Sequence, residues 1–178
     1  MSAVTIRDGQ WVAVHVRSNA EKHVAIGLRE RHYDQFLPTY RVQRHWKDRN
    51  VVLEVPLFPG YLFCRWDGSN PRRIVEIPGV LQIVGLGRVP VPVDEAEVAA
   101  IRRIVESGLP CKSWTLLRAG TRVRLVDGPL RGLEGILEST NSVNHVVVNV
   151  NLLKRAVAVR VHPSEVSVCT DPPYRLAS

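Results

Sequence analysis

The chain has 178 residues, of which 45% are apolar and 23% are charged. This length and composition suit one ordinary folded domain or two small ones, and they exclude a disordered chain, a large enzyme barrel and a long repeat array. The 24 Lys and Arg residues outnumber the 17 Asp and Glu residues, and the net charge of +7 favours anionic partners such as nucleic acid.

The first strand and helix are predicted near the N-terminus. Residues 11–16 form a β-branched run of strand length, and Ser18 and Asn19 are candidate caps for a helix over residues 20–33. A Phe-Leu-Pro sequence breaks that helix. Residues 40–50 then form a basic, aromatic-bearing stretch between two extended pieces, which is either a solvated hairpin tip or a nucleic-acid contact.

Two strands are predicted on either side of a proline kink. Residues 51–55 and 60–66 have strand patterns, and the two prolines within residues 56–60 fix φ and withhold hydrogen-bond donors. Because side chains alternate along a strand, Tyr61 and Phe63 should point to one face of the sheet, while the apolar side chains between them point to the other.

The rest of the first hundred residues contains one strand and two helices. A short helix is expected after Pro71, a strand over residues 80–84, and the clearest helix over residues 94–107, with Asp94 as its cap and Gly108 ending it. The alternation of strands and helices predicts an α+β fold for residues 1–107.

The second half of the chain has no helix pattern. Residues 108–118 lack periodicity and are expected to be a flexible linker. Five short strand candidates follow, separated by turn residues: 122–126, 133–139, 143–150, 156–160 and 165–169. This spacing predicts a small β-barrel over residues 119–170, followed by a C-terminal tail over residues 171–178.

The sequence holds no signature of catalysis, metal binding or membrane insertion. It lacks GxGxxG, GxxxxGK[ST], HExxH, GxSxG and paired CxxC motifs, and its histidines do not fall at metal-ligand spacing. Cys64, Cys111 and Cys169 suit neither a disulfide framework nor a zinc site. With no signal peptide or membrane-length apolar run, we expect a cytoplasmic, monomeric protein that is not an enzyme, with no cofactor, no metal and no membrane contact.

Two segments resemble one known family. PLFPGYLF at residues 56–63, together with Trp11, Glu21 and FLPTY at residues 36–40, resembles the N-terminal domain of the NusG family of bacterial transcription elongation factors. AGTRVRLVDGPLRGLEGIL at residues 119–137 resembles the KOW motif that opens the C-terminal barrel of the same family. The resemblance implies a NusG-type α/β sandwich domain followed by a small SH3-like KOW β-barrel.

The resemblance also implies a polymerase-binding surface. In the family, an aromatic face of the N-terminal sheet binds the clamp helices of the largest RNA polymerase subunit. That role falls here on Phe58, Pro59, Tyr61, Phe63 and, less directly, Trp11. The sequence-based hypothesis is that these residues form a bare aromatic surface, since large exposed apolar patches usually mark protein interfaces. The competing interpretation is that their rings are ordinary core.

Basic side chains are candidates for contact with the non-template DNA strand. Cationic grooves with stacking side chains bind single strands. Arg17 and His23 resemble DNA-reading positions of the antiterminator RfaH, and the basic stretch after residue 40 supplies further charge. The full candidate set is Arg17, Lys22, His23, Arg31, Arg41, Arg44, His45, Trp46, Lys47 and Arg49.

The KOW motif has structural and functional interpretations. Its residues are Gly128, Pro129, Leu130, Gly132 and Gly135, and tight turns with close backbone approach explain the glycines without a ligand. By resemblance, the barrel would contact the termination factor Rho or the ribosomal protein NusE. Leu130 stands where many members have Phe. The strand-favouring VVVNVNLL segment predicts a β-barrel rather than the helical form seen in RfaH-like paralogues.

Together these features predict an elongation and antitermination factor that suppresses pausing. The basic charge and the sequences of the FLPTYR, HWKDR and PLFPGYLF segments favour a specialised, RfaH-like paralogue, with a housekeeping NusG as the alternative. A KOW-type ribosomal RNA-binding protein and a nucleic-acid-modifying enzyme remain as interpretations from other classes.

Overall fold

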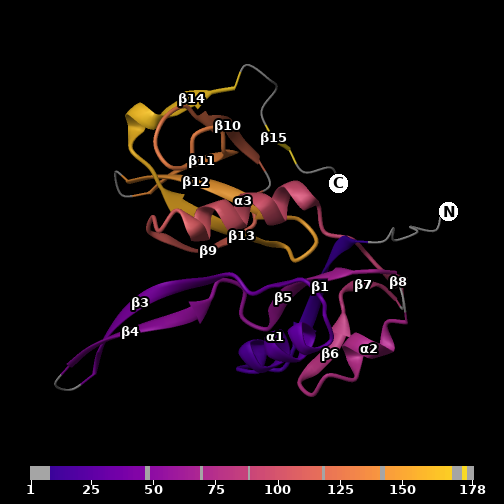
Figure 1. Cartoon of the computed structure of the whole chain (residues 1–178). Coiled ribbons are helices and arrows are strands. Elements are labelled where there is room, and N and C mark those ends of the chain that lie inside the picture. Colours follow the sequence, from indigo (N-terminus) through magenta and orange to yellow (C-terminus); the bar gives the residue numbers. More distant parts are fainter. Residues whose placement is uncertain are drawn as a thin grey trace. The chain divides into compact units, whose positions relative to one another are not determined.

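A computed structural model describes residues 9–46, 49–68, 70–87, 89–117, 119–140, 143–169 and 174–175 (Figure 1). The chain divides into two compact units, residues 1–98 and 99–178. The boundary falls inside α3 (Glu95–Glu106), not at residue 107 as the sequence suggested. No helix within the described residues is long and apolar enough to span a membrane.

The first unit is built on a four-stranded antiparallel sheet in the order β2-β5-β1-β6. Its strands are β1 (Gln10–Val16), β2 (Gln35–Phe36), β5 (Tyr61–Trp66) and β6 (Val80–Ile83). The unit also holds α1 (Glu21–Glu30), the short α2 (Arg72–Val75) and the small ribbon of β7 (Gly85–Leu86) and β8 (Val89–Pro90). The expected strands, kink and short helix are therefore present.

One face of this sheet packs against α1. Val12, Val14 and Leu62 share a core with Val24 and Leu28 of the helix. The alternation of side chains along β1 and β5 puts these residues on one face and leaves Tyr61 and Phe63 on the other, as the sequence predicted. Burial of the apolar stripe of the helix is the main force holding α1 on the sheet.

The ends of α1 differ from the sequence-based expectation. Ala20 occupies the cap position and no side chain caps the helix, so the prediction of Ser18 or Asn19 as the cap is wrong. Asn19 instead adopts a left-handed conformation with φ 65°. The helix also stops at Glu30 instead of residue 33, because His32 has φ 65° and the Tyr33 N–H donates back to the Leu28 carbonyl.

The basic stretch is half of a long β-ribbon. β3 (Thr39–Trp46) and β4 (Arg49–Pro56) pair antiparallel as a separate two-stranded ribbon that projects from the sheet (Figure 1). The sequence suggested an extended piece only from residue 51. Cross-strand pairs such as Val42 with Leu53 extend both strands toward the tip.

The second unit is a curved sheet in the order β14-β10-β11-β12-β13-β9, with β15 beside β10. Its strands are β9 (Cys111–Thr115), β10 (Ala119–Leu125), β11 (Glu134–Thr140), β12 (Val143–Val150), β13 (Arg155–Arg160), β14 (Val166–Val168) and β15 (Tyr174–Arg175). A single 3₁₀ turn, Pro163–Glu165, precedes β14. The five predicted strands and the β form of this unit are confirmed.

The expected linker is largely a strand. β9 pairs with β13 over five residues, and Asn149 exchanges hydrogen bonds with the N–H and carbonyl of Leu117 at 3.2 and 2.8 Å. Residues 108–118 are therefore not a free tether. The segment has no periodic signal because β9 is an edge strand with one partner, and its pairing depends on a strand forty residues further along the chain.

Candidate functional site

The kink between β4 and β5 is held by buried hydrogen bonds. The Glu21 side chain is only 5% exposed, and its Oε1 accepts a hydrogen bond from the Gly60 N–H at 2.9 Å. The Gly60 carbonyl accepts from the Val16 N–H at 2.8 Å, and the Leu57 N–H donates to the Pro38 carbonyl at 2.9 Å. The start of α1 and the end of β1 thus fix the position of the PLFPG segment.

Aromatic rings gather on the sheet face opposite α1. His15 and Tyr61 are directly opposite on β1 and β5, and their rings stack with centroids 4.8 Å apart. Phe63 lies 6.2 Å from Phe36 in a stacked arrangement and 5.9 Å from Phe58 edge to face. We call Phe36, Phe58, Tyr61, Phe63 and His15 the aromatic cluster; such ring pairs add stability beyond their buried area.

The hypothesis of a bare aromatic surface is wrong for three of its five residues. Phe58 and Phe63 are 0% exposed and Trp11 is 4% exposed. Only Pro59 is exposed, and Tyr61 is half-buried. The kink folds Phe58 back onto Phe63, and burying both rings is strongly favourable. In this structure these rings are therefore core, as the competing interpretation held.

The sequence did not single out His15, Phe36 or Arg65. The Arg65 guanidinium lies 5.3 Å from the Trp11 ring centroid and pairs with Glu95 at the start of α3. His15 is opposite Tyr61 and Arg65 is opposite Trp11. The two-residue alternation of side chains along β1 and β5 places His15 and Arg65 on the same sheet face as Tyr61. Phe36 needed the pairing of β2 with β5, which has no local signal.

The predicted nucleic-acid residues form two groups. Arg17, Lys22 and His23 are exposed between the end of β1 and the first turn of α1, and Arg31 is half-buried just past the end of that helix. The remaining described residues belong to the ribbon, where Arg41, Arg44, His45 and Arg49 are exposed. Trp46 is the last residue of β3, and Lys47 lies outside the described residues.

The ribbon separates its basic side chains onto two faces. Trp46 pairs with Arg49 and Arg44 with Val51, so Arg44 and Arg49 share one face. Arg41 and His45 share the other, on which Glu54 lies opposite Arg41. The sequence-based set is therefore not one continuous basic patch, and a strand of nucleic acid on one face of the ribbon would meet only one of these pairs.

The KOW residues shape the β10–β11 turn. Gly128 and Gly132 have φ of 78° and 84°, which other residues rarely adopt. A Cβ on Gly135 would lie 2.7 Å from the Val147 carbonyl oxygen. Leu130 is buried in the unit, whereas Pro129 is exposed. These positions support the structural explanation of the glycines.

No reactive constellation is evident among the described residues. They contain no group of three His, Cys, Asp or Glu side chains placed to hold a metal ion. Burial, with the charges of Asp34 and Asp67, raises the pKa of the Cys64 thiol to about 12, so it stays protonated at neutral pH. Cys64 is therefore unsuited to act as a nucleophile.

The order of an α/β unit before a curved β-sheet unit is also found in a solved structure. The solved structure of Thermotoga maritima NusG shares this fold, with a TM-score of 0.57, 23% identity, and coverage of 89% of this chain and 96% of that one. This likeness concerns the fold alone.

Sequence comparison identifies the family. The family described as "Transcription termination factor nusG" matches residues 9–102, more than half of the chain. The transcription termination/antitermination protein NusG of Thermus thermophilus is 31% identical, over 88% of this chain and 97% of its own length. The corresponding Pseudomonas aeruginosa protein is 28% identical over the same shares. The chain belongs to the NusG family of transcription termination and antitermination factors.

Proposed function

We propose that this protein binds RNA polymerase through its first unit and suppresses pausing during elongation. The observation that carries the proposal is the PLFPG kink, anchored by Glu21 inside the region that matches the family. Buried hydrogen bonds hold this segment in one conformation, so binding through it costs little ordering entropy.

The contact with the clamp helices of the polymerase is assigned to the accessible part of the kink. Pro59 is exposed and Tyr61 is half-buried, with its ring stacked on His15. Phe58 and Phe63 support these two residues from the core instead of touching the partner. Trp11 is likewise assigned a packing role. This revises the sequence-based hypothesis, in which all five residues made the contact.

The exposed cations contribute a contact with the non-template DNA strand. Arg17, Lys22 and His23 are exposed near the start of α1, and the ribbon carries Arg44 and Arg49 on one face and Arg41 on the other. Lys and Arg side chains supply the salt-dependent part of the affinity for single strands. The second unit would recruit a further factor, Rho or NusE, through the exposed part of the KOW turn at Pro129.

Such a factor acts by binding alone. If it binds the closed, elongating polymerase more tightly than the paused state, it shifts the equilibrium by the ratio of the two affinities. A specialised, RfaH-like role remains the finer proposal, and the general NusG role is favoured by the names of the relatives. Genome-wide occupancy separates them, because a specialised factor would be found on few operons and a general one on nearly all.

The test is the affinity of the full chain for purified core RNA polymerase, measured by fluorescence anisotropy. We expect Tyr61→Ala to weaken binding about tenfold or more, whereas Tyr61→Phe keeps the stacked ring and binds nearly as wild type. Leu86→Ala is the matched control, because it removes an apolar side chain of the same unit that is 76% exposed and lies outside the kink. Wild-type affinity of a folded Tyr61→Ala chain would disprove the assignment.

A further inference from the structure

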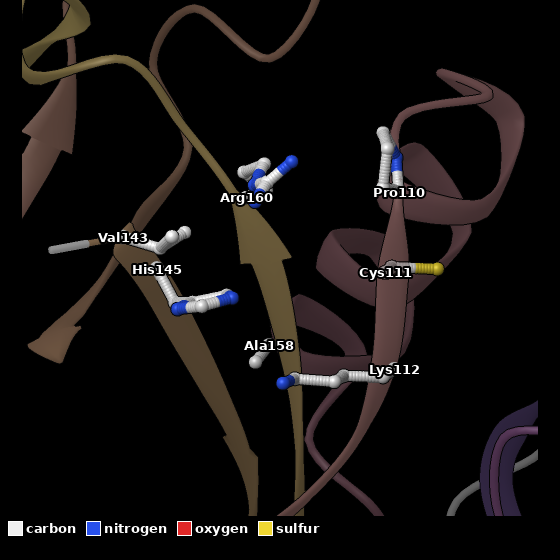
Figure 2. A pocket seen from close by; sticks show the side chains of 7 residues that line it. All are labelled: Pro110, Cys111, Lys112, Val143, His145, Ala158 and Arg160. Carbon is white, nitrogen blue, oxygen red and sulfur yellow. The ribbon is translucent and has the colours of Figure 1, made fainter. Parts of the chain in front are cut away.

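The second unit has a cavity of about 330 Å³ that the proposed function does not use. It lies against β9, β12 and β13, and the side chains that give it its chemistry are Lys112, His145 and Arg160, with Ala158 between them. Figure 2 shows the nitrogen ends of Lys112 and His145 pointing toward each other across Ala158.

Strand register brings these four residues together. Arg160 is directly opposite His145, and Ala158 is directly opposite Lys112, so all four side chains lie on one face of the sheet. Ala158 lies on β13, between β9 and β12, and its small side chain leaves space between Lys112 and His145. A larger side chain at this position would narrow the cavity.

Trp114 holds two of the nitrogen-bearing side chains in place. Its ring stacks on His145 with centroids 5.6 Å apart, and the Lys112 Nζ lies 4.5 Å from the ring centroid. Trp114 in turn packs on a small buried cluster of Val147, Ala156 and Ala158. The donors are therefore positioned before any ligand arrives, which reduces the entropy cost of binding.

Lys112 and Arg160 give the cavity a positive charge, and no lining side chain that the structure describes offsets it. None of the described residues that line it is acidic. Burial, together with the charges of Lys112 and Arg160, lowers the pKa of His145, while a backbone hydrogen bond at Val143 and the charge of Glu138 on β11 act in the opposite direction. Two like charges facing an imidazole make the cavity a favourable place for an anion.

We propose that this cavity binds a phosphate group of a single-stranded nucleic acid. Lys112 and Arg160 supply the charge, and the His145 ring supplies an N–H donor. The volume is that of a small-ligand site. Paired cations beside a hydrogen-bond donor are also the groups that a cationic groove offers to the backbone of a single strand.

This site is separate from the first-unit surfaces of the proposed function, and its test needs no polymerase. The probe is a fluorescein-labelled uridine dodecamer, titrated with the full chain at several salt concentrations. We expect the double variant Lys112→Ala/Arg160→Ala to bind about tenfold more weakly. The slope of log K against log salt should fall by about 0.7 for each phosphate that the variant no longer neutralises.

Two further variants separate the effect of the cavity from the effect of net charge. Arg131→Ala/Lys154→Asn removes two exposed charges of the same unit and should bind as wild type; Asn is used because Lys154 has φ 54°. Ala158→Val keeps every charge and narrows the cavity, and it should weaken binding as the double variant does. A loss caused only by charge would leave Ala158→Val unaffected and would overturn the proposal.

The pKa of His145, measured from the NMR signals of its imidazole ring, reports directly on binding at the cavity. With the dodecamer bound, the pKa of His145 should rise, since a phosphate stabilises the protonated ring. Inorganic phosphate and poly-glutamate are titrated in parallel. A rise with either of these but not with the dodecamer would assign the cavity to a free anion or an acidic protein, and would contradict the proposal. So would an unchanged pKa with all three.

Discussion

At the scale of single residues, one buried carboxylate organises the kink. Glu21 lies at the start of α1, where the helix dipole favours a negative charge, and it also accepts the Gly60 N–H. The sequence marks Glu21 only through its resemblance to the family. Its physical role required the tertiary structure, because its partner is 39 residues away.

The loss of this carboxylate should destabilise the first unit. Glu21→Ala leaves the partly buried Gly60 N–H without its acceptor, so the free energy of unfolding should fall by about 1–3 kcal/mol. Glu21→Gln keeps an acceptor and should cost less. Urea unfolding followed by circular dichroism measures both. Equal losses for the two variants would mean that the hydrogen bond contributes nothing.

The burial of the aromatic face depends on residues that no local pattern connects. Strand alternation correctly placed Tyr61 and Phe63 together, away from Leu62 and Cys64. Alternation does not say whether a face is covered, because burial depends on segments that are distant in sequence. Phe58, in the kink, packs on Phe63 in a way that no local pattern indicates.

At the scale of elements, the ribbon of β3 and β4 turns a basic sequence into two different faces. Counting charges along residues 41–49 suggests one patch, whereas the register puts Arg44 and Arg49 on one face and Arg41 and His45 on the other. The sequence shows the number of basic residues in this segment. Only the strand pairing shows which of them share a face of the ribbon.

Reversing charge on one face should therefore have a stronger effect than on the other. We expect Arg44→Glu to weaken binding of single-stranded DNA more than Arg41→Glu, because Glu54 lies opposite Arg41 and already offsets part of its charge. The salt slope of binding should fall with the affinity. Arg72→Glu, an exposed charge reversal on α2, is the control. Equal losses for all three would point to net charge instead of the ribbon.

The strand β9 shows the limit of local signals most clearly. A segment without periodicity is interpreted as a linker, yet it pairs with β13 and contributes Lys112 and Trp114 to the cavity of the second unit. By contrast, α3 was predicted to within one residue at each end, because Asp94 caps it and Gly108, with φ 68°, ends it.

At the scale of the whole molecule, each unit has its own apolar core. Leu62 lies in the core beneath α1, and Val147, Ala156 and Ala158 form a cluster in the second unit. Leu62→Ala should cost about 2–5 kcal/mol. Hydrogen exchange should then show lower protection in β1 and β5, with β12 and β13 unchanged. An equal fall in protection in all four strands would mean that the chain unfolds as one unit.

The sequence by itself indicated the family, through the motifs at residues 56–63 and 119–137, and it determined the order of an α/β unit before a β unit and the three helices with most of the longer strands. The order of the units and their elements follow from periodicity, caps and turn residues, which act between near neighbours in the chain. Only the tertiary structure decided which aromatic rings are buried, how the ribbon divides its charge, and that the supposed linker is a strand beside a cationic cavity. Each of these depends on contacts between segments that are distant in the sequence, and the local sequence of one segment does not indicate such contacts.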